Sequence, residues 1–291
     1  MRKINKLEIP QKLLDAQAEI EAKLLEKGKD FSWKDNNKYY SEPVREELLQ
    51  LYNQKCAFCE TKFSKNTKDI RYSTIEHYRP KAYYWWLGNE WTNLFPVCNY
   101  CNDKKADNFI TKNPLQKKKN LAVAPIENGI LNRQKCSANH ANLVDEKPQL
   151  LHPEIDNPED FLEFTTKGKA IQKAETIVNR NIQQTLDLLN LSTNEEERLD
   201  KIGKRKDYFD KNILNFLEYA PNDFQDTDLR LSFFTFFKEL INWTDIKSQY
   251  SLLGIEMLNK FEEFFLVNKD ETVRKIVVQA FELFINENIN K

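Results

Sequence analysis

The chain has 291 residues, of which 31% are charged and 12% aromatic, with only 6 glycines and 10 prolines. This composition is ordinary for a folded protein and too aromatic for a disordered one, and the length suits a small module plus a second domain. The formal net charge of -1 excludes the overall basic excess typical of a non-specific polyanion binder, so any contact with nucleic acid must be local.

Two features of the sequence bear on location. The N-terminus interrupts its apolar run with Pro10, Gln11 and Lys12, so it lacks the apolar stretch of a signal peptide. No segment approaches the roughly 20 apolar residues that span a membrane. We therefore expect a cytoplasmic protein without membrane contact, in which the five cysteines are reduced.

The predicted elements change in character along the chain. Residues 41–53 read as a helix, with Pro43 in the first turn and apolar residues at helical spacing. From there to about residue 125 the segments are short and irregular, as in a small module organised by a bound ligand. Beyond Leu150 long amphipathic helices are expected, the last of them with Asp270 as its N-cap. They cover about 171–190, 199–220, 227–243, 250–267 and 270–287.

These elements predict an α+β, mostly helical protein in three parts. An N-terminal helical segment covers residues 1–54, and a small module covers residues 55–156. An α-helical C-terminal domain covers residues 157–291.

Two C-x-x-C pairs, Cys56 with Cys59 and Cys98 with Cys101, enclose most of the irregular segment. Four thiolates from two such pairs can surround one zinc ion at about 2.3 Å, and a closed four-sulfur shell is the structural type of zinc site. A thioredoxin-like redox site needs only one pair, so the doubled spacing favours structural zinc. The remaining cysteine, Cys136, is expected to act as a small buried hydrophobe.

Between the cysteine pairs the sequence reads IEHYRPK at 75–81, WTNL at 91–94 and CNYCNDKK at 98–105. This arrangement resembles the HNH, or ββα-metal, nuclease family. The resemblance implies a zinc-stapled ββα-metal module in which His77 is the general base and Asn93 orients the loop that carries it. It also implies that Glu76 and Asn102 bind a catalytic divalent ion. Asparagine at the third position makes the pattern H-N-N and leaves the choice between Mg and Mn open.

The chemistry of phosphodiester hydrolysis calls for these residue types. The attacking water must be deprotonated near neutral pH, and imidazole has an ordinary pKa of about 6.5. The oxygens of Glu76 and Asn102 are hard ligands that suit Mg or Mn. Adjacent residues of a strand point to opposite faces, so Glu76 and His77 serve one site only if the strand twists or ends there.

Local charge favours a nucleic-acid substrate despite the neutral chain. Residues 79–119 contain eight basic and three acidic residues, including the lysine run 117–119. Phosphate contacts are expected from four of the basic residues: Arg79, Lys81, Lys104 and Lys105. The aromatic run 83–86 either stacks on unpaired bases or packs over the module, and both interpretations stay open.

Longer segments resemble the PtuB family, the HNH subunits of Septu and Septu-containing retron anti-phage systems. They are PVREELLQLYNQKCAFCE at 43–60, the segments around His77 and Cys98, and LLHPEIDNPEDFLEF at 150–164. In the last of these, His152, Asp156 and Asp160 either approach the active site or belong to a structural loop. Residues after about 210 carry no motif that we can match.

The PtuB resemblance implies an effector nuclease paired with PtuA, an ATPase of ABC or SMC type. DNA is the expected substrate, with RNA including tRNA left open. The helices after residue 157 would then dock the ATPase, with anchors such as Phe233, Phe234, Phe236, Phe237 and Trp243, although several of these must fill the core.

Two alternatives remain. The first is a free-standing HNH nuclease of restriction or homing type, which the absence of a neighbouring PtuA-like gene would favour. The second is a non-catalytic zinc module that binds nucleic acid or protein, against which the full set of Glu76, His77, Asn93 and Asn102 argues.

Overall fold

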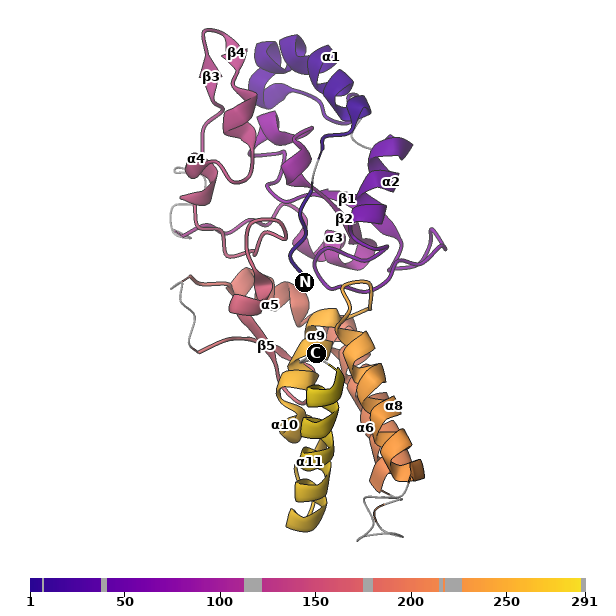
Figure 1. Ribbon diagram of the computed structural model, residues 1–291. Helices are drawn as coiled ribbons and strands as arrows, with labels where there is room; N and C mark the ends of the chain where they lie inside the picture. Colours follow the sequence, from indigo (N-terminus) through magenta and orange to yellow (C-terminus); the bar gives the residue numbers. More distant parts are fainter. Residues whose placement is uncertain are drawn as a thin grey trace. The chain divides into compact units, whose positions relative to one another are not determined.

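The computed structural model describes residues 1–6, 8–37, 41–112, 122–174, 180–214, 217 and 227–288. Close to half of the chain is helical and the strands are short, which confirms the α+β class. The chain forms two compact units (Figure 1). The first unit comprises Met1–Leu162 and Gln172–Leu189, and the second comprises Glu163–Ile171 and Asn190–Lys291.

The first unit is built around a two-stranded antiparallel sheet. Strand β1 pairs with β2 so that Ser73 lies opposite Cys98 and His77 opposite Leu94. Helix α3 begins at the residue after β2 and packs against both strands. The elements of this unit are α1 (Gln11–Lys27), α2 (Glu42–Leu51), β1 (Ser73–His77), β2 (Leu94–Cys98), α3 (Asn99–Lys105), β3 (Ile126–Glu127), β4 (Ile130–Leu131), α4 (Ala141–Val144) and α5 (Gln183–Leu189).

The core of the first unit joins the N-terminal helices to the loop between β1 and β2. The predicted helix 41–53 is α2, which has a proline in its first turn and buries Val44, Leu48 and Leu49. Leu13, Ile20 and Leu24 of α1 belong to the same apolar cluster. From the β1–β2 loop the cluster takes the aromatic side chains Tyr84, Trp86 and Trp91. The residues before the first cysteine pair are therefore part of the framework that surrounds the sheet.

The second unit is a helical bundle that carries a short hairpin of β5 (Leu162–Phe164) and β6 (Ala170–Gln172). Its core is dominated by phenylalanine rings in edge and stacked contacts, for example Phe236 with Phe265 at 5.3 Å. The helices are α6 (Ser192–Phe209), α8 (Thr227–Thr244), α9 (Ser251–Asn259), α10 (Phe261–Phe265) and α11 (Glu271–Asn288), with a π-helical turn at Asp210–Leu214 after α6.

Four of the five proposed docking anchors lie in this core, so they are not exposed as a docking surface requires. Phe233, Phe236, Phe237 and Trp243 are at most 6% exposed. A phenylalanine-rich helix that packs against other helices buries its rings in their shared bundle, because burying each ring removes a large apolar area from water.

The helix predictions hold unevenly. Asp270 caps α11 as expected, because its Oδ1 accepts a hydrogen bond from the Val273 amide at 3.0 Å. The helix expected over 171–190 is wrong for its first part, since β6 includes residues 171 and 172; residues 175–179 lie outside the described residues. The helix expected over 250–267 is broken at Lys260, between α9 and α10.

Candidate active site and cysteine cluster

The four paired cysteines come together as predicted. Cys56 and Cys59 lie in the turn after α2, Cys98 ends β2 and Cys101 lies in α3. All four are buried, and their sulfur atoms lie within 4.8 Å of one another. The backbone joins the two pairs directly, because the Ala57 amide donates to the Pro96 carbonyl at 2.9 Å. The cluster is close enough to bind a metal such as zinc.

The charges around the sulfurs fit this donor set. Four thiolates around a divalent zinc ion would carry a net charge of about -2. Arg71 compensates part of it, since its Nη1 lies 3.5 Å from Cys98 Sγ and 3.8 Å from Cys59 Sγ. Burial raises the pKa of Cys59, but the other three sulfurs and Arg71 outweigh burial and hold that pKa well below its ordinary value. Cys136 is buried outside this cluster, as expected.

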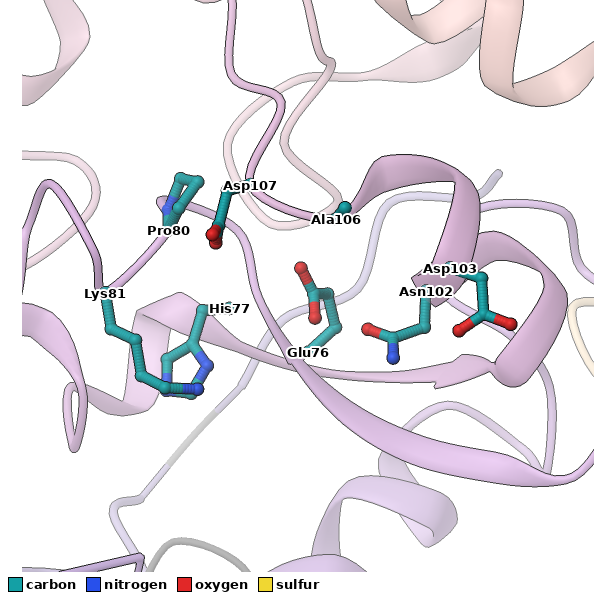
Figure 2. Close-up of a pocket in the computed structure, with 8 residues that line it drawn as sticks. All are labelled: Glu76, His77, Pro80, Lys81, Asn102, Asp103, Ala106 and Asp107. Atoms are coloured by element: carbon teal, nitrogen blue, oxygen red, sulfur yellow. The ribbon is translucent and has the colours of Figure 1, made fainter. Parts of the chain in front are cut away.

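Glu76 and His77 line one pocket because β1 ends at His77. The pocket has a volume of about 340 Å³ and lies between the end of the strand and α3. Figure 2 shows Glu76 between His77 and Asn102, with the Asn102 amide directed toward Glu76 and Asp103 pointing away. Glu76 and His77 can therefore serve one site although they are neighbours in the chain, because the strand ends there. The lining residues are Glu76, His77, Pro80, Lys81, Asn102, Asp103, Ala106 and Asp107.

His77 is held as a neutral imidazole. Its side chain is buried, and Nε2 lies 2.9 Å from the Gly88 carbonyl oxygen. A carbonyl only accepts, so Nε2 carries the proton and Nδ1 carries the lone pair. Burial, followed by the nearby charge of Lys81, lowers the pKa of His77 to about 3, and the Gly88 carbonyl only partly opposes this. The ring is therefore in the unprotonated form that a base requires.

Glu76 is bound to the end of α3 through Lys105. The Lys105 Nζ lies 2.7 Å from Glu76 Oε1 and donates to the carbonyls of His77 at 2.8 Å and Ala106 at 3.3 Å. Lys105 is buried. Burial raises the pKa of Glu76, and Lys105 opposes that rise. A phosphate contact by Lys105 remains a prediction that would require breaking these bonds.

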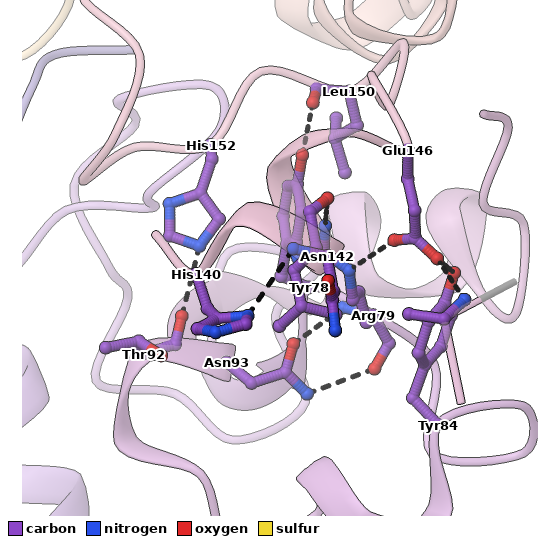
Figure 3. Close-up of polar contacts among 12 residues, drawn as sticks. Tyr78, Arg79, Tyr84, Thr92, Asn93, His140, Asn142, Glu146, Leu150 and His152 are labelled. Carbon is purple, nitrogen blue, oxygen red and sulfur yellow. Dashed lines mark hydrogen bonds and ion pairs between the residues drawn. The ribbon is translucent and has the colours of Figure 1, made fainter. Parts of the chain in front are cut away.

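Asn93 closes the loop that follows His77 (Figure 3). Its Oδ1 accepts from the Arg79 amide at 2.8 Å, and its Nδ2 donates to the carbonyls of Arg79 and Leu87, each at 3.1 Å. The Asn93 backbone carbonyl also accepts from the Tyr78 amide at 2.9 Å. These bonds tie both ends of the loop together, which is the arrangement that an orienting role requires.

The segment 141–152 supports the same loop from outside the hairpin (Figure 3). The buried guanidinium of Arg79 donates to Glu146 at 2.8 Å and to the Leu143 carbonyl at 2.6 Å. Tyr84 donates to the other oxygen of Glu146 at 2.7 Å. Glu146 was not singled out in the sequence, since a lone glutamate carries no motif. Arg79 therefore has an internal role, and its contact with nucleic acid remains a prediction.

Two of the predicted phosphate-binding lysines lie where a ligand can reach them. Lys81 lines the pocket, and Lys104 is exposed on α3, with its Nζ 6.0 Å from the ring of Tyr100. Burial lowers the pKa of Lys81, while Glu76 and Asp107 oppose that shift. Asp103 and Asp107 also line the pocket and were missed as site residues, because an aspartate near the end of a helix is common on surfaces. The lysines at 117–119 lie outside the described residues.

The remaining motif residues hold the framework. His152 is buried, with Nε2 3.1 Å from the Thr92 carbonyl, and Asp156 forms an ion pair with Arg180 at 2.7 Å. This is the structural-loop interpretation of the LHPEIDN segment. In the aromatic run, Tyr84 and Trp86 are buried in the core, which removes these two from stacking on bases.

Fold and site together define an α+β protein in which one sheet and one helix share a four-cysteine cluster and a His–Glu–Asn pocket. A stretch of 107 residues is 32% identical to the Septu protein PtuB of Bacillus thuringiensis, covering 36% of this chain and 37% of that protein. A stretch of 143 residues is 29% identical to the Septu protein PtuB of Bacillus mycoides, covering 45% of this chain and 41% of that protein. These matches support membership of the PtuB-type Septu family.

A third match is of another kind. A stretch of 169 residues is 27% identical to the Septu protein PtuA of Bacillus mycoides, covering 53% of this chain but only 20% of that protein. The chain thus spans well under half the length of each of these curated relatives. No protein-family model matches the sequence. Among the described residues, no helix combines the length and apolar character needed to cross a membrane.

Proposed function

We propose that this chain is a metal-dependent HNH endonuclease, the effector subunit of an ATPase-regulated Septu anti-phage defence system. The observation that carries the proposal is the pocket in which β1, its following loop and α3 bring Glu76, His77 and Asn102 together. The order of strand, strand and helix supports assigning residues 73–105 to the ββα-metal module. The relatedness to PtuB proteins supports the assignment to Septu.

His77 is the general base. Its Nε2 proton is engaged by the Gly88 carbonyl, so Nδ1 takes the proton from the attacking water. An imidazole with a lowered pKa is fully in its neutral, basic form at neutral pH, although the lower pKa also makes it a weaker proton acceptor. Lys81, in the same pocket, offers positive charge to the phosphate.

Glu76 and Asn102 are the ligands that we assign to Mg or Mn. Carboxylate and amide oxygens are the hard donors that these ions prefer, and both side chains line the pocket. Lys105 engages Oε1 of Glu76, so we assign Oε2 to the ion. When bound, the divalent ion supplies Lewis-acid stabilisation of the phosphate and the leaving oxygen.

The cysteine cluster is assigned to structural zinc and the substrate to nucleic acid, with DNA favoured over RNA or tRNA. The partner is a PtuA-like ATPase, and the similarity to a part of PtuA supports a place in the same system. We assign the docking to residues 157–291.

The decisive experiment compares cleavage of DNA and RNA with Mg or Mn, with and without a PtuA-like ATPase. Wild-type activity that disappears in His77→Ala supports the proposal. Cleavage by the wild-type chain that does not depend on the ATPase would favour a free-standing nuclease, as would the absence of a PtuA-like gene beside its own. Binding of nucleic acid without cleavage under every condition would favour the non-catalytic zinc module.

A further inference from the structure

The backbone conformation of Gly88, whose carbonyl accepts a hydrogen bond from His77, does not require a glycine. Its φ of -64° and ψ of -31° lie in the right-handed helical region, which every residue adopts. The side chain of Trp33 is what requires a glycine at this position. A Cβ atom built on Gly88 would lie 2.2 Å from Cζ2 and 2.3 Å from Cε2 of Trp33. The indole ring thus occupies the space that any side chain at residue 88 would need.

Trp33 is itself fixed in place. It follows the short 3-10 helix Gly28–Asp30, is buried, and packs edge-on against Phe31 with ring centroids 5.0 Å apart. Its Nε1 donates to the Trp85 carbonyl at 3.1 Å, three residues before Gly88. The ring therefore contacts the 85–88 turn at two points, and this buried ring has little freedom to give way.

We infer that Trp33 is a positioning residue for His77, acting through Gly88. The chain of contacts runs from the indole ring to the Gly88 backbone, and from the Gly88 carbonyl to His77 Nε2 at 2.9 Å. The hydrogen bond to the Gly88 carbonyl sets the tautomer of the imidazole and restrains its rotation, and hence the direction of the Nδ1 lone pair. The N-terminal segment, which lies outside the hairpin and helix of the site, thereby sets the orientation of the proposed base.

The catalytic part of this inference rests on the proposed nuclease function, whereas the structural part does not. A direct readout of the structural part is 15N NMR of protein labelled at its three histidines, recorded with zinc and without Mg or Mn. His77→Gln identifies the His77 signals. We expect wild-type His77 to show one neutral tautomer, protonated at Nε2, with a proton that exchanges slowly with water.

The first test is Trp33→Leu, with Leu131→Ala in the same apolar cluster as the matched control. Trp33→Leu should remove the slow exchange or mix the two tautomers at His77, and lower kcat by about 100-fold with little change in KM. Leu131→Ala deletes a buried side chain from that cluster and should leave the His77 signals in place. If the two variants alter the His77 signals equally, or neither does, the inference is overturned.

The second test uses Gly88→Ala, which adds one methyl group and guards against failure of Trp33→Leu to fold. In the wild-type background the methyl collides with Trp33, so kcat should fall at least about tenfold, and the His77 proton should exchange faster. In the Trp33→Leu background the space is free, so adding Gly88→Ala should change kcat by less than about twofold. Equal effects in both backgrounds would show that Trp33 is not what Gly88 accommodates.

The two levels of proposal fail separately. If His77→Ala cuts as fast as wild type, the proposed function is wrong, yet the NMR signals still decide whether Trp33 holds His77. If His77→Ala is inactive but Trp33→Leu retains both the wild-type His77 signals and kcat, only the positioning inference fails.

Discussion

His77 and Glu76 are neighbours in the chain, yet their surroundings favour different protonation states. Burial and two lysines lower the pKa of His77, while burial raises the pKa of Glu76 against the opposing charge of Lys105. Burial thus favours the neutral form of both groups, and at Glu76 the ion pair with Lys105 opposes it. The pairing of Glu76 with Lys105 could not be foreseen, because the lysine lies 29 residues away and its pattern fits a surface phosphate contact equally well.

The first prediction at this scale is loss of hydrolysis in His77→Ala. Removing a positioned base typically lowers kcat by about a thousandfold. Zinc content and the circular dichroism spectrum should stay at wild-type values, because His77 is not in the cysteine cluster. The matched control is His140→Ala, which removes a histidine that caps α4 outside the pocket. Wild-type cleavage by His77→Ala would refute the assigned base.

The second prediction concerns pH and stability. His77 has a pKa of about 3 when folded against about 6.5 when unfolded, so between these values the unfolded chain binds more protons. Stability should therefore fall as pH drops below about 6.5, by up to about 1.4 kcal/mol per pH unit from this group. The check is the free energy of unfolding from about pH 7.5 to pH 5 in zinc-replete buffer. His77→Gln should show a shallower loss than wild type; parallel curves would contradict the lowered pKa.

At the scale of elements, the spacing of the cysteines predicted the clustered sulfurs, because two short C-x-x-C turns can converge on one ion in few ways. The sequence could not place the aromatic loop or the segment 141–152, whose contacts with the hairpin are long-range and carry no periodicity. The error over 171–190 has a similar cause. Residues 170–172 pair as β6 within a three-residue hairpin strand, too short for alternation to outweigh the helical spacing around it.

The third prediction is one tightly held zinc ion per chain. Cys98→Ala removes a thiolate at the end of β2, directly before α3, so zinc should be lost and the first unit should unfold. Cys136→Ala is the matched control, because this buried cysteine lies outside the cluster. Elemental analysis and thermal unfolding measure both effects. A Cys98→Ala protein that stays folded with a full complement of zinc would rule out the cluster as a structural site.

The fourth prediction separates the basic residues by their surroundings. Lys104 is exposed on α3, so Lys104→Ala should weaken binding to all sequences alike and reduce the salt slope of the affinity by about 1. Lys105→Ala should instead destabilise the protein, because it removes the ion-pair partner of the partly buried Glu76. Fluorescence anisotropy over a salt series and denaturant unfolding distinguish the two. An unchanged salt slope in Lys104→Ala would count against its phosphate contact.

At the scale of the whole molecule, the division of labour between the two units follows from their side chains. The pocket, the cysteine cluster and the sequence motifs belong to the first unit, while the second is filled by phenylalanine rings. Amphipathic spacing predicted helices over most of the second unit, although the one expected over 250–267 is broken at Lys260. It could not tell which apolar residues face the bundle and which face a partner, since both faces carry the same residue types.

The fifth prediction is that residues 157–291 carry the docking surface for the PtuA-like ATPase. With four of the aromatic candidates buried, contacts should come from exposed apolar side chains such as Leu231 and Leu283, which are 65% and 49% exposed. Leu231→Glu should abolish co-purification with the ATPase and leave basal nuclease activity unchanged. Leu14→Glu, an exposed leucine on α1, is the control and should retain capture. Undiminished capture by Leu231→Glu and Leu283→Glu would place the surface elsewhere.

Helix α3 carries Cys101 and Asn102 as consecutive residues in a helix of seven. Under the proposed assignments, a sulfur ligand and a catalytic ligand sit on one short helix that has little stability of its own. Loss of the zinc ion would therefore also displace the ligand that we assign to the catalytic metal. Thiol oxidants that eject zinc should silence cleavage even though none of the assigned catalytic groups contains sulfur, and restoring the thiols with zinc should return it. Under these assignments, oxidising conditions would stop cleavage through loss of the zinc-bound scaffold, without any change to His77 itself.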